Sequence, residues 1–125
     1  MKQIISTTEA PQAIGPYSQA VMVNGMLYAS GQIAIDPKTG SLVGADIESQ
    51  TRQVMLNIQG VLNEVGYDFS NVIKTTVFIK NMSDFAVVNS IYGEYFKENA
   101  PARSCVAVAS LPKDALIEIE IVAFK

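Results

Sequence analysis

An alternation near the C-terminal end constrains the fold of this sequence more than any other feature. Three isoleucines, Ile117, Ile119 and Ile121, are separated by Glu118 and Glu120. Because successive side chains of a β-strand point to opposite faces of a sheet, the pattern predicts a strand with one apolar and one acidic face. The isoleucine face is expected to pack against helices.

Residues 103–109 are expected to pair with this strand as a hairpin. With a four-residue loop over 111–114, Cys105 lies opposite Glu120, and Arg103 joins the glutamates on the face away from the helices. A loop one residue different would place Arg103 among the isoleucines, so the four-residue loop is preferred. The acidic face also carries apolar side chains that the helices cannot reach. We therefore expect another copy of the chain to cover it, with a ligand site near the junction.

Local signals divide the rest of the chain into further strands and two helices. The pair Asn24-Gly25 between apolar runs is a strong two-residue hairpin signal. Apolar spacing typical of one helix face predicts a helix over about 47–65, with Asp46 as its N-cap and Gly66 after its end. A second helix should follow Ser83 as N-cap. Strands are expected over 2–6, 20–23, 26–29, 72–80, 103–109 and 116–124. The simplest packing is an α+β fold with both helices on one face of a mixed sheet.

Composition indicates one domain, residues 1–125, that associates with other copies. The chain is 49% hydrophobic, which is enough for a real core, and its charged fraction of 17% is low for a small monomer. A net charge of −3 without a basic run argues against a nucleic-acid partner. No apolar stretch has the length of a signal peptide or of a membrane span, so a cytoplasmic location and no membrane partner are expected.

The absence of histidine limits the chemistry. With no histidine and one cysteine, the chain lacks Ser-His-Asp and Cys-His nucleophile systems and the usual zinc ligands. No glycine-rich phosphate or dinucleotide motif is present. Any catalysis must therefore use carboxylates, arginine, lysine, tyrosine, hydroxyls, backbone groups and water.

Several segments together resemble one family. Residues 101–112 (PARSCVAVASLP), followed by 117–120 (IEIE), resemble the signature of the RidA branch of the reactive intermediate (enamine/imine) deaminases. Similar blocks occur elsewhere: Ala10-Pro11, 14–20 (IGPYSQA), 30–33 (SGQI), Val77-Phe78, Asp84-Phe85, and Val88-Asn89 with Tyr92. The resemblance covers essentially the whole chain, in order and at the right spacing.

This resemblance implies a chorismate-mutase-like fold and a homotrimer, formed through the face opposite the helices, with three clefts between subunits. It implies a 2-iminobutanoate/2-iminopropanoate deaminase, which hydrolyses the enamine and imine products of PLP-dependent dehydratases to 2-oxo acids and ammonia. No cofactor and no metal is implied. By position, Arg103 would hold the substrate carboxylate, Glu118 would hold the water, and Cys105 would contribute backbone groups. The remaining cleft residues would be Tyr17, Ser30, Gly31 and Asn89.

The residue types suit this chemistry. The planar guanidinium of Arg103 matches a carboxylate with two parallel hydrogen bonds. A carboxylate such as Glu118 can orient water and carry its proton as general base and then acid. From the residues alone, an ion pair between Arg103 and Glu118 or Glu120 is equally reasonable, because cross-strand ion pairs are common.

Simpler interpretations exist for the other residues. Cys105 has no histidine to activate it, so a small packed residue is favoured over a nucleophile or a redox sensor. Tyr17 could only pack a loop, and Ser30-Gly31 could only end a strand. At the level of function, a non-catalytic protein that binds 2-oxo acids or related metabolites is the alternative. A ribonuclease or translation inhibitor, an activity attributed to some relatives, is disfavoured by the acidic pI of about 4.8.

Overall fold

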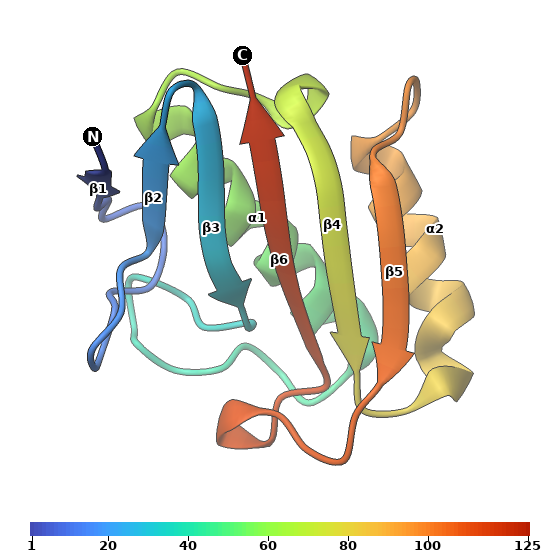
Figure 1. Ribbon diagram of the computed structural model, residues 1–125. Helices are drawn as coiled ribbons and strands as arrows, with labels where there is room; N and C mark the ends of the chain where they lie inside the picture. Colours follow the sequence, from blue (N-terminus) through green and yellow to red (C-terminus); the bar gives the residue numbers. More distant parts are fainter.

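A six-stranded mixed sheet with two helices on one face makes up the fold (Figure 1). The computed structural model describes all residues, 1–125. The strands, in the spatial order β1-β2-β3-β6-β4-β5, are β1 (Gln3–Ile5), β2 (Ala20–Val23), β3 (Met26–Gln32), β4 (Val72–Ile79), β5 (Ala102–Ala107) and β6 (Ile117–Phe124). The helices are α1 (Ile47–Glu64) and α2 (Phe85–Tyr95). The predicted α+β class, with both helices on one face of a mixed sheet, is confirmed.

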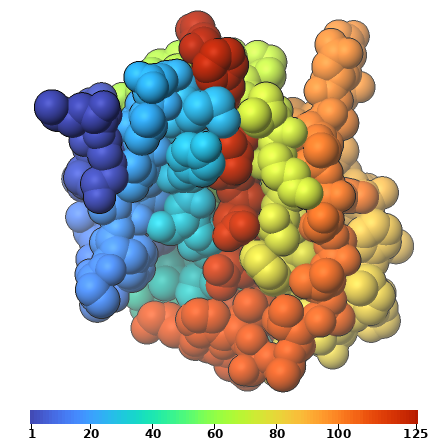
Figure 2. All heavy atoms as spheres, viewed as in Figure 1, coloured from blue at the N-terminus to red at the C-terminus, as the bar shows by residue number.

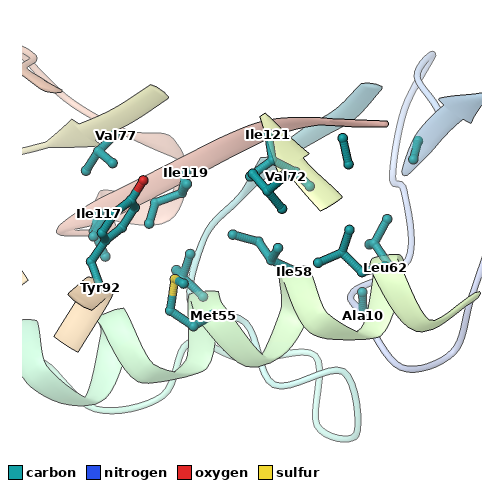
Figure 3. Packing of buried hydrophobic residues seen from close by; sticks show 14 of the residues in the cluster. Ala10, Met55, Ile58, Leu62, Val72, Val77, Tyr92, Ile117, Ile119 and Ile121 are labelled. Atoms are coloured by element: carbon teal, nitrogen blue, oxygen red, sulfur yellow. The ribbon is translucent and has the colours of Figure 1, made fainter. Parts of the chain in front are cut away.

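The alternating isoleucines place β6 at the centre of the core. Ile117, Ile119 and Ile121 are at most 2% exposed and share one apolar cluster with side chains of α1 such as Met55 and Ile58. Figure 3 shows the isoleucines and these α1 side chains packed between the helix and the sheet. Burying side chains of this size stabilises the fold by about 1.5–3 kcal/mol each, which is why the pattern determines the buried face.

The turn and the helix ends that local sequence signals predicted are present in the structure. The turn between β2 and β3 has positive φ at both Asn24 (49°) and Gly25 (83°), as a type I′ turn requires. The side chain of Asp46 accepts a hydrogen bond from the N–H of Ser49 at 2.9 Å and caps α1. After α1, Gly66 adopts a φ of 74°.

The N-cap predicted for α2 is wrong. Ser83 lies within a 3₁₀ turn, η2 (Met82–Asp84), and the helix begins one residue later, after Asp84. No side chain caps this helix. The 3₁₀ turn joins β4 to α2 directly, so the chain enters the helix already turning instead of through an extended capping residue.

The predicted hairpin between residues 103–109 and 116–124 is also wrong. β4 lies between β5 and β6, and it pairs parallel with β5 and antiparallel with β6. The cause is α2, because a helix that joins two neighbouring strands produces a parallel pair. The connection from β5 to β6 then passes the end of β4 through the 3₁₀ turn η3 (Pro112–Asp114).

The register reverses the predicted face of Arg103. Arg103 pairs with Thr75, which pairs with Ile121, so all three side chains lie on the helix side of the sheet. Glu118 pairs with Phe78 on the opposite side. Arg103 is therefore on the isoleucine face, which the assumed four-residue loop had excluded.

No helix covers the second side of the sheet, which we call the open face (Figure 2). It carries the exposed apolar side chains of Ile4, Tyr28, Val106 and Phe124 together with Glu118 and Glu120. Exposed apolar side chains gathered on one face of a sheet are typical of a surface that another molecule covers.

Candidate functional site

The predicted site residues lie in two groups on the chain. Tyr17, Ser30, Gly31 and Glu118 line one cavity of about 710 Å³, which we call the Glu118 cavity. Arg103, Asn89 and Cys105 lie at the other side of the sheet, at β5 and α2, and do not line this cavity. One copy of the chain therefore brings each group together but keeps the two groups apart.

A β-bulge shapes the Glu118 cavity. Ala29 pairs with Ile121 and Gln32 with Ile119, so the two residues Ser30 and Gly31 of β3 face a single residue of β6. Such bulges re-aim side chains and are frequent beside active sites. Because β3 continues through the bulge to Gln32, the interpretation of Ser30-Gly31 as a simple strand end is wrong.

Gly31 leaves the space that the Glu118 carboxylate occupies. A Cβ atom at position 31 would collide with Oε2 of Glu118 and would also lie 2.8 Å from its carboxyl carbon. The φ of Gly31 is not in the left-handed region, so the glycine is required by this close approach and not by its backbone conformation.

The electrostatic surroundings of Glu118 favour its protonated form. Partial burial raises the pKa of this carboxyl group, and the negative charge of Glu120 on the same face raises it further. Glu118 has no ion-pair partner within the chain to oppose these effects. A carboxyl group whose pKa lies closer to neutrality accepts and returns a proton more readily at physiological pH.

The other wall of the cavity is the loop between β1 and β2, residues 6–19, which the buried side chain of Gln19 holds in place. The Gln19 side chain accepts a hydrogen bond from the N–H of Thr7 at 2.6 Å and donates to the carbonyl of Pro11 at 2.7 Å. Tyr17 lies in this loop and is half exposed, and its hydroxyl accepts the N–H of Ile14 at 3.4 Å. Sequence reasoning missed Gln19, because its four loop contacts join residues that no local pattern connects.

Arg103 lies against α2 in the second group. Its Nη1 donates a hydrogen bond to Oδ1 of Asn89 at 2.8 Å. The guanidinium carbon lies 4.8 Å from the ring centroid of Tyr92 and 5.4 Å from that of Phe85. Arg103 forms no ion pair, so the cross-strand pairing with Glu118 or Glu120 that the residues alone allowed does not form within one chain.

Sequence reasoning missed Phe85 and Tyr92 as neighbours of Arg103. Tyr92 is buried, and a buried aromatic residue on a helix is ordinarily interpreted as core packing. The available signal was the spacing of Phe85, Asn89 and Tyr92, which puts all three on one helix face.

Cys105 is a packed thiol beside Arg103. It pairs with Val77, which pairs with Ile119, on the helix side of the sheet. Burial raises the pKa of the Cys105 thiol, and the positive charge of Arg103 only partly opposes this effect. The neutral thiol is a poor nucleophile, so the packed-residue interpretation is favoured.

Arg103 and Glu118 are too far apart to share one small substrate within one chain. Their positions differ by two strand spacings across the sheet and by three residues along the strands, which puts their Cα atoms roughly 14 Å apart. Their side chains point to opposite faces of the sheet. The expectation that both side chains share a face is wrong, because it rested on a hairpin that does not form.

Two other classes of feature are absent from the structure. No group of three or more His, Cys, Asp or Glu side chains is arranged to hold a metal ion. Neither helix has the length and apolar character needed to cross a membrane.

Comparison with known proteins places these observations in a family. The family described as endoribonuclease L-PSP matches residues 7–125. A RutC family protein of Pyrococcus horikoshii is 54% identical over 125 residues, which are 100% of this chain and 99% of that protein. The human protein named 2-iminobutanoate/2-iminopropanoate deaminase is 49% identical over 125 residues, with 100% and 91% coverage. The crystal structure of E. coli TdcF with bound serine matches with a TM-score of 0.94 and 42% identity, over 98% of each chain.

Proposed function

This chain belongs to the endoribonuclease L-PSP family, and we propose from that premise that it is a 2-iminobutanoate/2-iminopropanoate deaminase. It would hydrolyse reactive enamines and imines from PLP-dependent dehydratases to 2-oxo acids and ammonia, in the cytoplasm. The observation that carries the proposal is Arg103, a guanidinium held in place by neutral side chains with no carboxylate of its own chain. The serine bound to E. coli TdcF, which has a carboxylate and a nitrogen on one carbon, supports a substrate of this shape.

We assign to Arg103 the binding of the substrate carboxylate. Asn89 occupies one donor of its Nη1, and the remaining donors of the planar fork are available to a ligand. A hydrogen bond to a charged group contributes about 1.5–3 kcal/mol, and the fork also fixes the orientation of the carboxylate. This binding aligns the imine carbon for attack by water.

We assign to Glu118 the activation of the attacking water. The enamine first tautomerises to the imine, and the Glu118 carboxylate then takes a proton from water as the water oxygen bonds to the imine carbon. The Glu118 carboxyl group returns this proton to nitrogen, which gives the neutral carbinolamine. The same carboxylate then carries the hydroxyl proton of the carbinolamine to nitrogen, and the C–N bond breaks as the C=O bond forms, which releases ammonia and leaves the 2-oxo acid. The steps transfer protons and no electrons, so no cofactor is part of the proposal.

The cleft is proposed to combine two copies of the chain. Because Arg103 and Glu118 lie apart in one copy, the Arg103 group of one subunit would face the Glu118 cavity of the next. We propose a homotrimer, in which each copy places its Arg103 group against one neighbour and its Glu118 cavity against the other. The apolar side chains of the open face, such as Tyr28 and Phe124, support such a contact.

The first experiment measures 2-oxobutanoate release from threonine in a coupled dehydratase assay. We expect wild-type protein to accelerate release, and Arg103→Ala and Glu118→Gln to remove the acceleration. Arg52→Ala is the matched control, because Arg52 is exposed and pairs only with Glu94 and Glu48 of the helices. If wild type gives no acceleration, the catalytic proposal is wrong, and the alternative of a non-catalytic 2-oxo acid-binding protein is tested by direct binding.

A mixing experiment tests the shared cleft. Arg103→Ala and Glu118→Gln proteins are unfolded together, refolded at equal concentrations and assayed. Random assembly returns about a quarter of the clefts to a complete Arg103 and Glu118 pair, and therefore about a quarter of wild-type activity. Activity that stays at the level of the two separate variants would show that both residues act within one chain.

A ribonuclease function, which the family description suggests, is less well supported than the deaminase function. The Glu118 cavity is lined by the two carboxyl groups of Glu118 and Glu120 and only one cationic side chain, Lys113. A polyanion would be repelled by these carboxylates, and the net charge of −3 adds to the repulsion. A small monocarboxylate that binds first to Arg103 does not meet this difficulty.

A further inference from the structure

We infer that Tyr92, held by Thr75, positions the guanidinium of Arg103 and so determines how strongly the site prefers a carboxylate. Tyr92 is a positioning residue, because it acts through Arg103. The inference rests on the proposed function in one respect, namely that Arg103 receives the substrate carboxylate.

The first observation is the contact between ring and cation. The guanidinium carbon of Arg103 lies 4.8 Å from the centroid of the Tyr92 ring, within the range of a cation–π interaction. Tyr92 is only 5% exposed, whereas Arg103 is half-buried, so the ring forms the inner wall against which the cation rests. Figure 3 shows the Tyr92 side chain pointing from its helix toward the sheet.

The second observation is the anchor of the ring. The hydroxyl groups of Tyr92 and Thr75 lie 2.7 Å apart and form a buried hydrogen bond. Thr75 is 1% exposed and is the direct neighbour of Arg103 on the adjacent strand. The ring is therefore tied to the strand beside the one that carries Arg103, and the helix cannot shift relative to the cation without breaking this bond.

The third observation is that every contact of the guanidinium with α2 is neutral. Phe85, Asn89 and Tyr92 occupy one face of the helix, and Asn89 adds a hydrogen bond of 2.8 Å. Three neutral contacts restrict a long side chain with large rotamer freedom while leaving its charge uncompensated. Order that is present before the ligand arrives is not lost on binding, and this favours the carboxylate.

The test compares two ligands that differ in one charge. Isothermal titration calorimetry gives the dissociation constants of 2-oxobutanoate and of its neutral analogue 2-oxobutanamide. The dissociation constant of the amide divided by that of the acid measures the preference for the carboxylate. We expect wild type to prefer 2-oxobutanoate. Tyr92→Leu should reduce the ratio about tenfold, and Thr75→Val and Tyr92→Phe about threefold, because these last two keep the ring and remove its anchor.

Tyr95→Leu is the matched control. Tyr95 lies on the same helix and packs on Phe69 at a centroid distance of 5.1 Å, with no contact to Arg103. A variant that merely loosens the fold binds both ligands less well and keeps the ratio. Thr75→Val is the smallest change, so the test remains valid if Tyr92→Leu does not fold.

The outcomes separate this inference from the proposed function. Ratios that fall in the Tyr92 and Thr75 variants and not in Tyr95→Leu support the positioning role, even if no protein accelerates imine hydrolysis. Ratios equal to that of wild type overturn it. A wild-type protein that binds both ligands equally also overturns it, because Arg103 then does not receive the carboxylate.

Discussion

Glu118 and Arg103 both carry ionisable side chains, and the chain surrounds them in different ways. The carboxyl group of Glu118 is partly buried beside a second carboxyl group, which raises its pKa. The guanidinium of Arg103 rests on neutral groups and carries an uncompensated charge. Neither arrangement is expected of residues that serve stability alone, because a structural ion pair would have compensated both charges.

The raised pKa of Glu118 gives a pH prediction. As a general base, Glu118 acts in its charged form, so activity falls as the pH drops through its pKa, which lies above the ordinary glutamate value of about 4.3. Glu120→Gln removes one cause of the elevation. It should therefore move the acid limb of the rate profile to lower pH.

The profile is measured as kcat/KM against pH in buffers of constant ionic strength. Glu94→Gln, which changes a carboxylate paired with Arg52 on the helices, is the control and should leave the limb in place. An acid limb that does not move in Glu120→Gln would contradict the assignment of this limb to Glu118.

Gly31 gives a second prediction at the scale of a single residue. Gly31→Ala should lower kcat/KM about a hundredfold, because the added methyl group displaces the Glu118 carboxylate by about 1 Å. Gly93→Ala is the matched control, since a Cβ at position 93 meets no atom within 4 Å. Equal activity of the two variants would show that the place of the carboxylate is not critical.

At the scale of an element, α1 carries a glycine whose role is packing. Glycine in the interior of a helix costs about 1 kcal/mol relative to alanine. At Gly60 a Cβ atom would collide with the backbone carbonyl oxygen of Glu9. The N-terminal loop can therefore lie against the helix only where the side chain is absent.

Opposite effects are expected from the same substitution in the two helices. Gly60→Ala should destabilise the protein by about 1–3 kcal/mol, because backbone must move to admit the methyl group. Gly93→Ala, in open space on α2, should stabilise it by up to about 1 kcal/mol. Thermal unfolding of both variants measures the difference, and a stabilising Gly60→Ala would refute the packing role.

At the scale of the whole molecule, the sheet has one covered face and one open face. Tyr28, on the open face, and Leu56, on the outer side of α1, are each 50% exposed. Tyr28 shares the open face with the exposed apolar side chains of Ile4 and Phe124, whereas Leu56 lies away from the sheet. The proposed assembly therefore predicts very different consequences for two equally exposed side chains.

Placing a charge at each position tests the assembly. Tyr28→Glu should lower the mass in solution from trimer to monomer and remove deaminase activity, because a buried unpaired charge opposes association. Leu56→Glu should leave both unchanged. Light scattering coupled to size-exclusion chromatography measures the mass. A trimer that persists in Tyr28→Glu would show that this part of the open face is not the contact.

Contacts between residues near in sequence could be predicted. Asn24-Gly25 adopts the turn that its residue types require, and the Asp46 cap and the strand around Ile119 formed within a residue or two of the expected positions. In each case the physical cause lies within a few residues, in a turn conformation, a cap or the alternation of side chains. The identities of the candidate site residues came from the resemblance to a family and remain predictions of role.

The order of the strands, and with it the place of Arg103, was decided only by the tertiary structure. Alternation shows which residues share a face of one strand, but it does not show which strand lies beside it. The crossover through α2 inserted β4 between β5 and β6, and this moved Arg103 to the helix side beside Tyr92. Local periodicity determines elements and buried faces, whereas strand order depends on packing between segments far apart in the chain.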